Sequence, residues 1–301
     1  MTDLATTHIA LPTGVELNVQ LGGPEDGEPI LFLHGFPESH RTWRAVLPEL
    51  ARDFRVVAPD QRGFGGSDKP EGVEAYKADQ VLGDVIALAD ALGLERFTLV
   101  GHDWGGAIAW LAALKQPDRV KRLVIVNAPH PYLFQKSVIE DEAQRAASQY
   151  ILAFRNPQME KGIEAMGLHT FLEKSFSGHV DLDLVPNEER QAYVANWQKP
   201  GALTAMLNWY RASDIQVPAV GEEAEPPIWT RFAFPSIVVP TLVIWGLRDK
   251  ALLPVQLDGL HALVEDLRLV TVAEAGHFIP WELPEPVVAG IRDFIRETPD
   301  A

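Results

Sequence analysis

The sequence predicts an α/β fold, in which a mainly parallel sheet is flanked by helices and a separate helical segment is inserted. Short apolar runs alternate with helical patterns as far as residue 126, and such runs are typical of strands covered on both faces. This alternation indicates parallel strands joined by right-handed crossovers. It stops near residue 130 and resumes at residue 240. We therefore expect a core of residues 1–129 and 231–301, with residues 130–230 forming a helical cap over the carboxyl ends of the strands.

Local patterns predict each element in turn. Pro12-Thr13-Gly14 predicts a turn between strands 7–11 and 15–21, which form a hairpin at the edge of the sheet. Apolar runs predict the other strands, at 30–33, 54–58, 97–100, 123–126, 240–245 and 267–272. Apolar residues at helical spacing predict helices at 43–50, 81–92, 107–114 and 286–295.

The composition excludes several classes of function. The net charge is −16, from 42 acidic and 26 basic residues, which disfavours binding to nucleic acid or to an anionic membrane. The chain has no cysteine, so it has no disulfide, no thiolate nucleophile and no cysteine-ligated metal. We find no signal peptide at Met1-Thr2-Asp3-Leu4 and no apolar run long enough to span a membrane. We expect a cytoplasmic protein that is a monomer or a homodimer.

The stretch Gly101-His102-Asp103-Trp104-Gly105-Gly106 joins the strand at 97–100 to the helix at 107–114. It has the form of a nucleophile elbow, Gly-x-Asp-x-Gly, with aspartate where serine is commoner. A sharp strand-to-helix turn strains its central residue and leaves no room for side chains at the flanking glycines. The helix N-terminus favours the ionised carboxylate, which is the nucleophilic form. The alternative is that Asp103 only caps the helix.

Two further residues complete a possible catalytic triad. Asp249 follows the strand at 240–245, and His277 follows the strand at 267–272. A carboxylate nucleophile forms an ester with its substrate, so turnover needs a base to activate water and an acid to orient that base. The order nucleophile, acid, histidine is that of the α/β-hydrolases. Taken singly, Asp249 is also compatible with a turn and His277 with a capping or core histidine.

The chain resembles the soluble epoxide hydrolase family of the α/β-hydrolase superfamily over nearly its whole length. The resemblance rests on five motifs: His34-Gly35-Phe36-Pro37, Asp60-x-Arg62-Gly63-Phe64-Gly65-x-Ser67, Gly101-His102-Asp103-Trp104-Gly105-Gly106, Asn208-Trp209-Tyr210-Arg211 and Gly276-His277. It implies an α/β-hydrolase fold with a mostly parallel eight-stranded sheet and an inserted helical cap. It also implies an oxyanion hole formed by the backbone N–H groups of Phe36 and Trp104.

The family uses two cap tyrosines that hold the epoxide oxygen and protonate it as the ring opens. Tyr210, in Asn-Trp-Tyr-Arg, matches the second of these, and Tyr150 matches the first through a shorter segment. Ring opening leaves a strongly basic alkoxide, which needs a proton donor nearby. The alternative for both tyrosines is packing in the core.

The elbow is shared with haloalkane and haloacetate dehalogenases, which stay open as alternatives. Haloalkane dehalogenases need two N–H donors for the halide. Trp104 would supply one, and the second would be a cap tryptophan, Trp197 or Trp209, because the frequent asparagine is replaced here by Phe36. Haloacetate dehalogenases place arginines after the nucleophile, where this chain has Trp104 and Ala107.

The resemblance therefore implies hydrolysis of a small hydrophobic epoxide to a vicinal diol. Asp103 attacks a ring carbon, Tyr150 and Tyr210 protonate the oxygen, and His277, oriented by Asp249, activates water to split the ester. The substrate would contact Phe36, Trp104, Tyr150 and Tyr210, and no metal ion or cofactor is implied. A non-catalytic ligand-binding relative of the α/β-hydrolases is the second alternative.

Overall fold

The computed structural model describes residues 4–298; Met1 to Asp3, on which the expected absence of a signal peptide partly depends, lie outside this range. One eight-stranded sheet runs through it in the order β1-β2-β4-β3-β5-β6-β7-β8. β2 pairs antiparallel with β1 and β4, and the other strand pairs are parallel, which confirms the predicted mostly parallel sheet. The strands are β1 (Ala5–Ala10), β2 (Glu16–Gly22), β3 (Pro29–Leu33), β4 (Arg55–Pro59), β5 (Phe97–His102), β6 (Val120–Val126), β7 (Thr241–Gly246) and β8 (Leu267–Val272).

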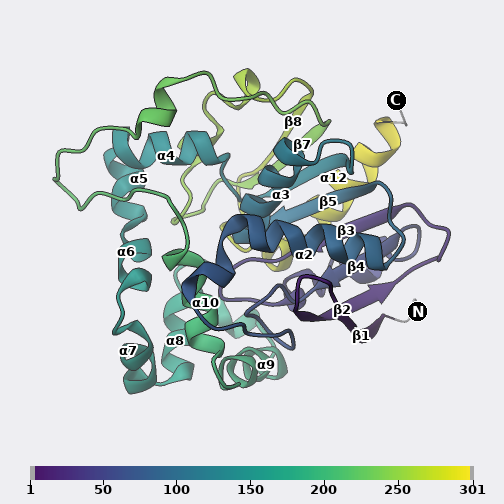
Figure 1. Ribbon diagram of the computed structural model, residues 1–301, viewed down its shortest axis with the longest axis horizontal. Helices are drawn as coiled ribbons and strands as arrows, with labels where there is room; N and C mark the ends of the chain where they lie inside the picture. Colours follow the sequence, from purple (N-terminus) through teal and green to yellow (C-terminus); the bar gives the residue numbers. More distant parts are fainter. Residues whose placement is uncertain (1–3, 299–301) are drawn as a thin grey trace.

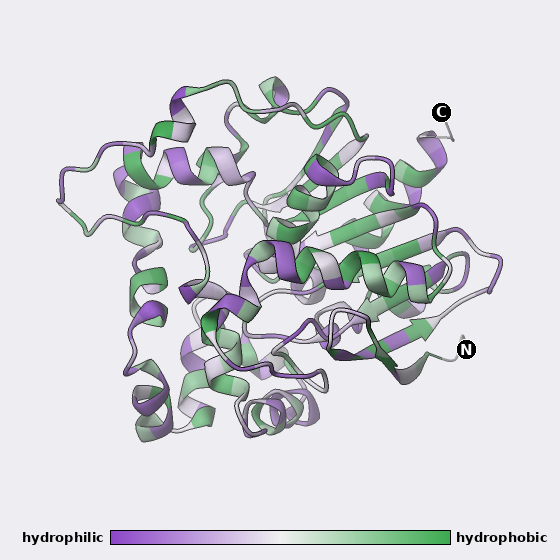
Figure 2. Ribbon diagram, viewed as in Figure 1, coloured by the Kyte–Doolittle hydropathy of each residue, from purple (hydrophilic) through white to green (hydrophobic). Residues whose placement is uncertain are grey.

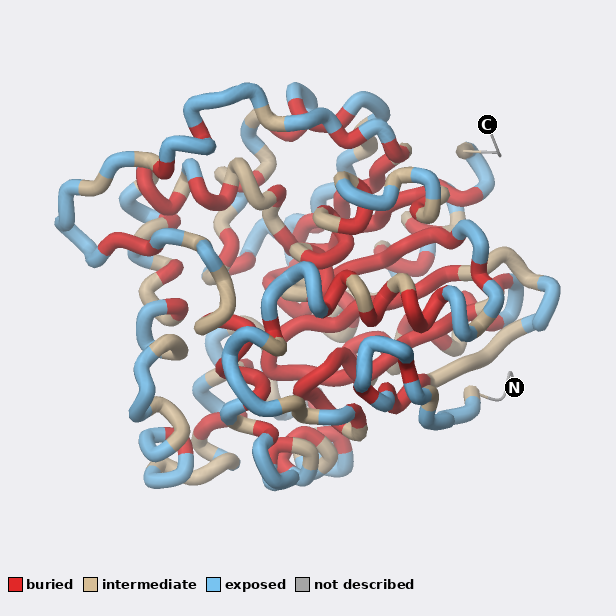
Figure 3. Tube along the Cα trace, in the orientation of Figure 1, coloured by how far each residue is buried: buried red, intermediate tan, exposed pale blue. Residues whose placement is uncertain are grey.

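Successive side chains of each strand point to opposite faces of the sheet, so a hydrophobic core forms on each face. In β3, Leu31 and Leu33 pack on the face covered by α2 (Ala78–Ala91) and α3 (Trp104–Lys115), whereas Ile30 and Phe32 pack on the face covered by α12 (Pro284–Glu297). Figure 2 shows the central strands as mainly hydrophobic, and Figure 3 shows that they are buried. The sheet thus forms a rigid base, and its strand ends can position side chains accurately.

One predicted helix is wrong. The segment 43–50 forms a short 3₁₀ helix, His40–Trp43, and then only a single α-helical turn, α1 (Leu47–Leu50). Pro48 lies in the first turn of α1, where its missing N–H costs nothing, but in the interior of a continuous helix it would remove a hydrogen bond and clash. The apolar residues of this segment are nevertheless buried against the sheet.

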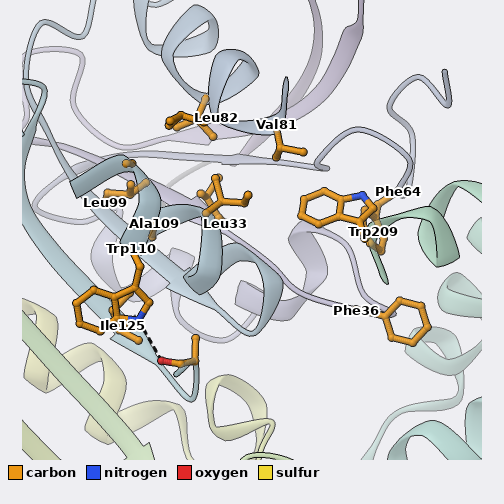
Figure 4. Close-up of a cluster of buried hydrophobic side chains, with 14 of the residues drawn as sticks. Leu33, Phe36, Phe64, Val81, Leu82, Leu99, Ala109, Trp110, Ile125 and Trp209 are labelled. Atoms are coloured by element: carbon orange, nitrogen blue, oxygen red, sulfur yellow. Dashed lines mark hydrogen bonds between the residues drawn. The ribbon is translucent and has the colours of Figure 1, made fainter. Parts of the chain in front are cut away.

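Most of the chain between β6 and Arg211 is helical and lies to one side of the sheet in Figure 1, and a largely irregular segment then leads to β7. The helices are α4 (Pro131–Glu140), α5 (Glu142–Ala147), α6 (Gln149–Arg155), α7 (Met159–Met166), α8 (Leu168–Phe176), α9 (Asn187–Trp197) and α10 (Ala202–Arg211). Trp209 of α10 packs edge-on against Phe64, as Figure 4 shows, with ring centroids 5.4 Å apart. Within residues 4–298, we find no helix that is long and apolar enough to cross a membrane.

Candidate active site

Asp103 lies at a sharp turn between β5 and α3, with a φ of 51° that non-glycine residues seldom adopt. The positions of the turn that flank Asp103, Gly101 and Gly105, have room only for glycine. A Cβ at Gly101 would lie 2.5 Å from the carbonyl oxygen of Gly105, and a Cβ at Gly105 would lie 2.3 Å from that of Leu33. The turn presents the Asp103 carboxylate at the first turn of α3. Such strain is typical of a functional position.

The loop after β3 reaches the Asp103 carboxylate. The backbone N–H of Phe36 donates to Asp103 Oδ1 at 2.7 Å. This approach depends on Gly35, because a Cβ there would lie 2.3 Å from the same oxygen. Trp104 is the first residue of α3, so its N–H has no partner within the helix. The Phe36 N–H therefore stabilises negative charge on Oδ1, and the N–H of Trp104, the next residue after Asp103, is not used by the helix.

His277 and Asp249 lie on the other side of the carboxylate. Nδ1 of His277 is 2.7 Å from Asp249 Oδ2, and its Nε2 is 3.7 Å from Asp103 Oδ2. Both residues are buried. Burial lowers the pKa of His277, but the charge and hydrogen bond of Asp249, with a contribution from Asp103, raise it to about 9. Burial alone would raise the pKa of Asp249, but His277 and further hydrogen-bond donors lower it below its ordinary value. The pair can hold a proton next to Asp103.

Asn127, which the sequence analysis missed, holds Asp249 in place. It follows β6 with a φ of 40°, and its Nδ2 donates to Asp249 Oδ2 at 2.8 Å. Its Oδ1 accepts from the N–H of Gly246 at the end of β7, at 2.9 Å. The other Asp249 oxygen accepts from the N–H groups of Ala251 and Leu252, at 2.9 Å each. Asp249 is therefore fixed on both oxygens. An asparagine directly after a buried parallel strand was the signal that could have identified it.

Two buried polar residues lie behind His277. Nε2 of His102 is 2.8 Å from the carbonyl oxygen of His277, and its Nδ1 is 3.4 Å from Oε2 of Glu38. The other Glu38 oxygen accepts from the Tyr193 hydroxyl of α9 at 3.1 Å. This network fixes the backbone that carries the base and connects it to the helical segment. Sequence reasoning did not assign Glu38.

Tyr150 of α6 and Tyr210 of α10 line the same cavity of about 220 Å³ as Asp103 and His277. The two tyrosine rings are edge to face, with centroids 6.0 Å apart. Burial raises the pKa of both hydroxyls, and the Asp103 carboxylate raises it further. Both tyrosines are therefore protonated at neutral pH, beside the nucleophile. A hydrogen bond from Trp104 opposes this rise in the pKa of Tyr210.

The tryptophans considered as halide ligands are engaged elsewhere. The indole N–H of Trp197 donates to the carbonyl oxygen of Pro37 at 2.8 Å, and the indole N–H of Trp209 donates to the carbonyl oxygen of Arg62 at 3.1 Å. An indole has a single N–H donor. Trp197 and Trp209 thus fasten α9 and α10 to loops of the sheet rather than presenting donors to the cavity. Across residues 4–298, no cluster of three histidine, cysteine, aspartate or glutamate side chains is arranged to hold a metal ion.

Comparisons with known proteins agree with this geometry. Residues 28–284 match the family model described as alpha/beta hydrolase fold. The chain is 34% identical to the AB hydrolase superfamily protein YfhM of Bacillus subtilis, over 94% of this chain and 95% of that protein. It is 32% identical to Epoxide hydrolase 3 of Xenopus tropicalis, over 95% of this chain and 76% of that protein. A solved structure described among novel epoxide hydrolases in metagenomes from hot environments superposes with a TM-score of 0.88 at 44% identity, covering 97% of this chain and 99% of that one.

Proposed function

We propose that this chain, which belongs to the epoxide hydrolase family of the α/β-hydrolase superfamily, hydrolyses an epoxide to a vicinal diol through an ester on Asp103. The observation that carries the mechanism is the shared cavity. Its lining includes Asp103, the two protonated tyrosines and His277, which is paired with Asp249 behind it, and the cavity volume is about 220 Å³. The helical segment 130–230 would act as the cap that contributes the tyrosines.

In the first step, Oδ2 of Asp103 attacks a ring carbon, because Oδ1 is held by the Phe36 N–H. The carbon–oxygen bond of the ring breaks, and the epoxide oxygen takes a proton from Tyr150 or Tyr210. An alkoxide is more basic than a phenolate, so this transfer is favourable. The attack also removes the negative charge of Asp103, which had raised the pKa of both tyrosines. The hydroxyls thus become more acidic as the alkoxide develops.

In the second step, His277, neutral once the ester has formed and its proton has passed to solvent, takes a proton from water, and the hydroxide attacks the carbonyl carbon of the ester. The Phe36 and Trp104 N–H groups stabilise the oxyanion. The bond between the carbonyl carbon and Oδ2 breaks, His277 protonates the departing oxygen, and the diol leaves. The new Asp103 carboxylic acid loses its proton, which restores the tyrosine. Formation of the ester prepares this step, because loss of the Asp103 charge removes one cause of the raised His277 pKa.

The test compares two substrates. We expect diol from styrene oxide and no chloride from a terminal chloroalkane. Chloride release without any diol would contradict the proposal and favour the dehalogenase alternative, against which the engaged indoles of Trp197 and Trp209 argue. Recovery of both compounds unchanged after long incubation would favour a ligand-binding relative. We also propose that the protein acts in the cytoplasm, as a monomer or homodimer, since a chain without cysteine suits a reducing compartment.

A further inference from the structure

The cavity that holds Asp103 is apolar inside and cationic toward solvent. Its inner wall is largely aromatic, with Phe36 and Phe154 beside the two tyrosines. Two exposed lysines also line it: Lys174 near the end of α8, and Lys250 in the loop after β7. Apart from Asp103 itself, none of the lining residues is acidic. This local excess of positive charge contrasts with the net charge of −16 on the whole chain.

Within residues 4–298, Lys174 and Lys250 lack the partners that most other lysines have. Six of the nine lysines contact a carboxylate or donate to a backbone carbonyl, and these are Lys69, Lys77, Lys115, Lys121, Lys136 and Lys199. Within residues 4–298, Lys161, Lys174 and Lys250 have no such partner. Lys161 is exposed on α7 and is not among the lining residues of the cavity. Lys174 and Lys250 are thus available to an anion that enters the site.

His179 adds a polar, uncharged group to the lining of the cavity. It lines the cavity beside Lys250, and its ring centroid is 5.7 Å from that of His277. Burial and the neighbouring His277 lower its pKa to about 4, so it is neutral at pH 7. Its Nδ1 has no hydrogen-bond partner within residues 4–298. A second cavity, of about 480 Å³, also includes His179 and Lys250, and its charged lining is mixed, with Arg44 and Arg248 beside Asp181, Glu274 and Glu282.

We propose that the preferred substrates are epoxides with an anionic group, such as a carboxylate, at the end opposite the oxirane. This inference rests on the proposed function. The anionic end would lie between Lys174 and Lys250, and the apolar body against the aromatic wall. Asp103 and Asp249 at the inner end repel an anion, so the oxirane enters first. The lysines therefore select the class of substrate and also fix its orientation.

The experiment compares kcat/KM for styrene oxide bearing a para-carboxylate with kcat/KM for its methyl ester. The proteins are the wild type, Lys174→Gln, Lys250→Gln, the double variant, and Lys161→Gln as the matched control. We expect each substitution at the cavity to reduce kcat/KM for the carboxylate about twofold to fivefold, as for exposed ion pairs, with the ester unchanged. Added salt should reduce the carboxylate preference of the wild type and leave that of the double variant unaffected.

The outcomes separate this inference from the proposed function. If the double variant still forms diol and its kcat/KM for the carboxylate relative to that for the ester equals the wild-type ratio, the role of the lysines is overturned. An equal loss in Lys161→Gln would overturn it as well, because the effect would then reflect net charge alone. If neither substrate yields a diol in the wild type, the proposed function itself fails.

Discussion

The rings of Trp104 and Tyr210 lie edge to face with centroids 5.1 Å apart, so the indole N–H of Trp104 can donate to the Tyr210 hydroxyl. Because the indole only donates, the Tyr210 oxygen accepts and its own hydrogen stays available for a substrate. Burial raises the pKa of Tyr210, whereas this hydrogen bond opposes the rise. The residue after Asp103 therefore contacts Tyr210, the proposed proton donor. It connects the elbow directly with α10.

Replacing the proton donor tests the first chemical step. We expect Tyr210→Phe to slow formation of the alkyl-enzyme about a hundredfold, as for the loss of a general acid, measured by single-turnover kinetics with styrene oxide. Tyr132→Phe is the matched control, because its hydroxyl donates to Thr230, and it should leave the rate unchanged. A Tyr210→Phe enzyme with the wild-type rate would refute the donor role.

Trp104→Phe keeps the aromatic ring and removes only the indole donor. We expect ring opening to slow severalfold, since Tyr210 loses both its orientation and the partner that lowers its pKa. In the Tyr210→Phe background, where no hydroxyl remains to be oriented, the same substitution should have little effect. Additive losses in the double variant would show that Trp104 acts independently of Tyr210.

Asn127 positions the acid of the triad, so its removal should slow the second step more than the first. We expect Asn127→Ala to reduce the rate of ester hydrolysis about tenfold and to leave ring opening nearly unchanged. We also expect it to destabilise the fold by about 1–3 kcal/mol, because the N–H of Gly246 loses its partner. Rapid-quench kinetics and thermal denaturation measure the two effects. Equal slowing of both steps would argue against a role specific to Asp249.

The raised pKa of His277 predicts how stability depends on pH. Its pKa is about 9 in the folded protein, against an ordinary value of 6.5. Because the folded state binds this proton more tightly, the stabilisation is fully present below pH 6.5 and is lost as the pH rises through 9. We expect Tm to fall over that window more steeply in the wild type than in His277→Gln. If Tm falls equally with pH in the two proteins, the raised pKa of His277 is contradicted.

Much of the fold was predictable because each strand has its own local signal. The apolar runs identified the strands of the sheet, and strand ends in a parallel sheet share one edge, which suggested that Asp103, Asp249 and His277 would meet. The helix at 43–50 was mispredicted because its apolar spacing outweighed the breaking effect of Pro48.

The contacts that refine the site could not be predicted in this way. Asn127 meets Asp249 across 122 positions of sequence, and Glu38 meets Tyr193 across 155. No local pattern encodes which loop or cap helix faces which strand end. For the same reason, the sequence showed Lys174 and Lys250 only as isolated charges, and the folded chain brings both to the lining of one cavity.

The covalent route is the central claim, and a single turnover in oxygen-18 water tests it most directly. With enzyme in excess over epoxide, Oδ2 of Asp103 becomes an oxygen of the diol, and solvent oxygen enters the carboxylate. We expect mass spectrometry to find no solvent oxygen in the first diol and one oxygen-18 atom in the proteolytic peptide that contains Asp103. Label in the first diol, with Asp103 unlabelled, would contradict the account, because water would then have attacked the epoxide directly.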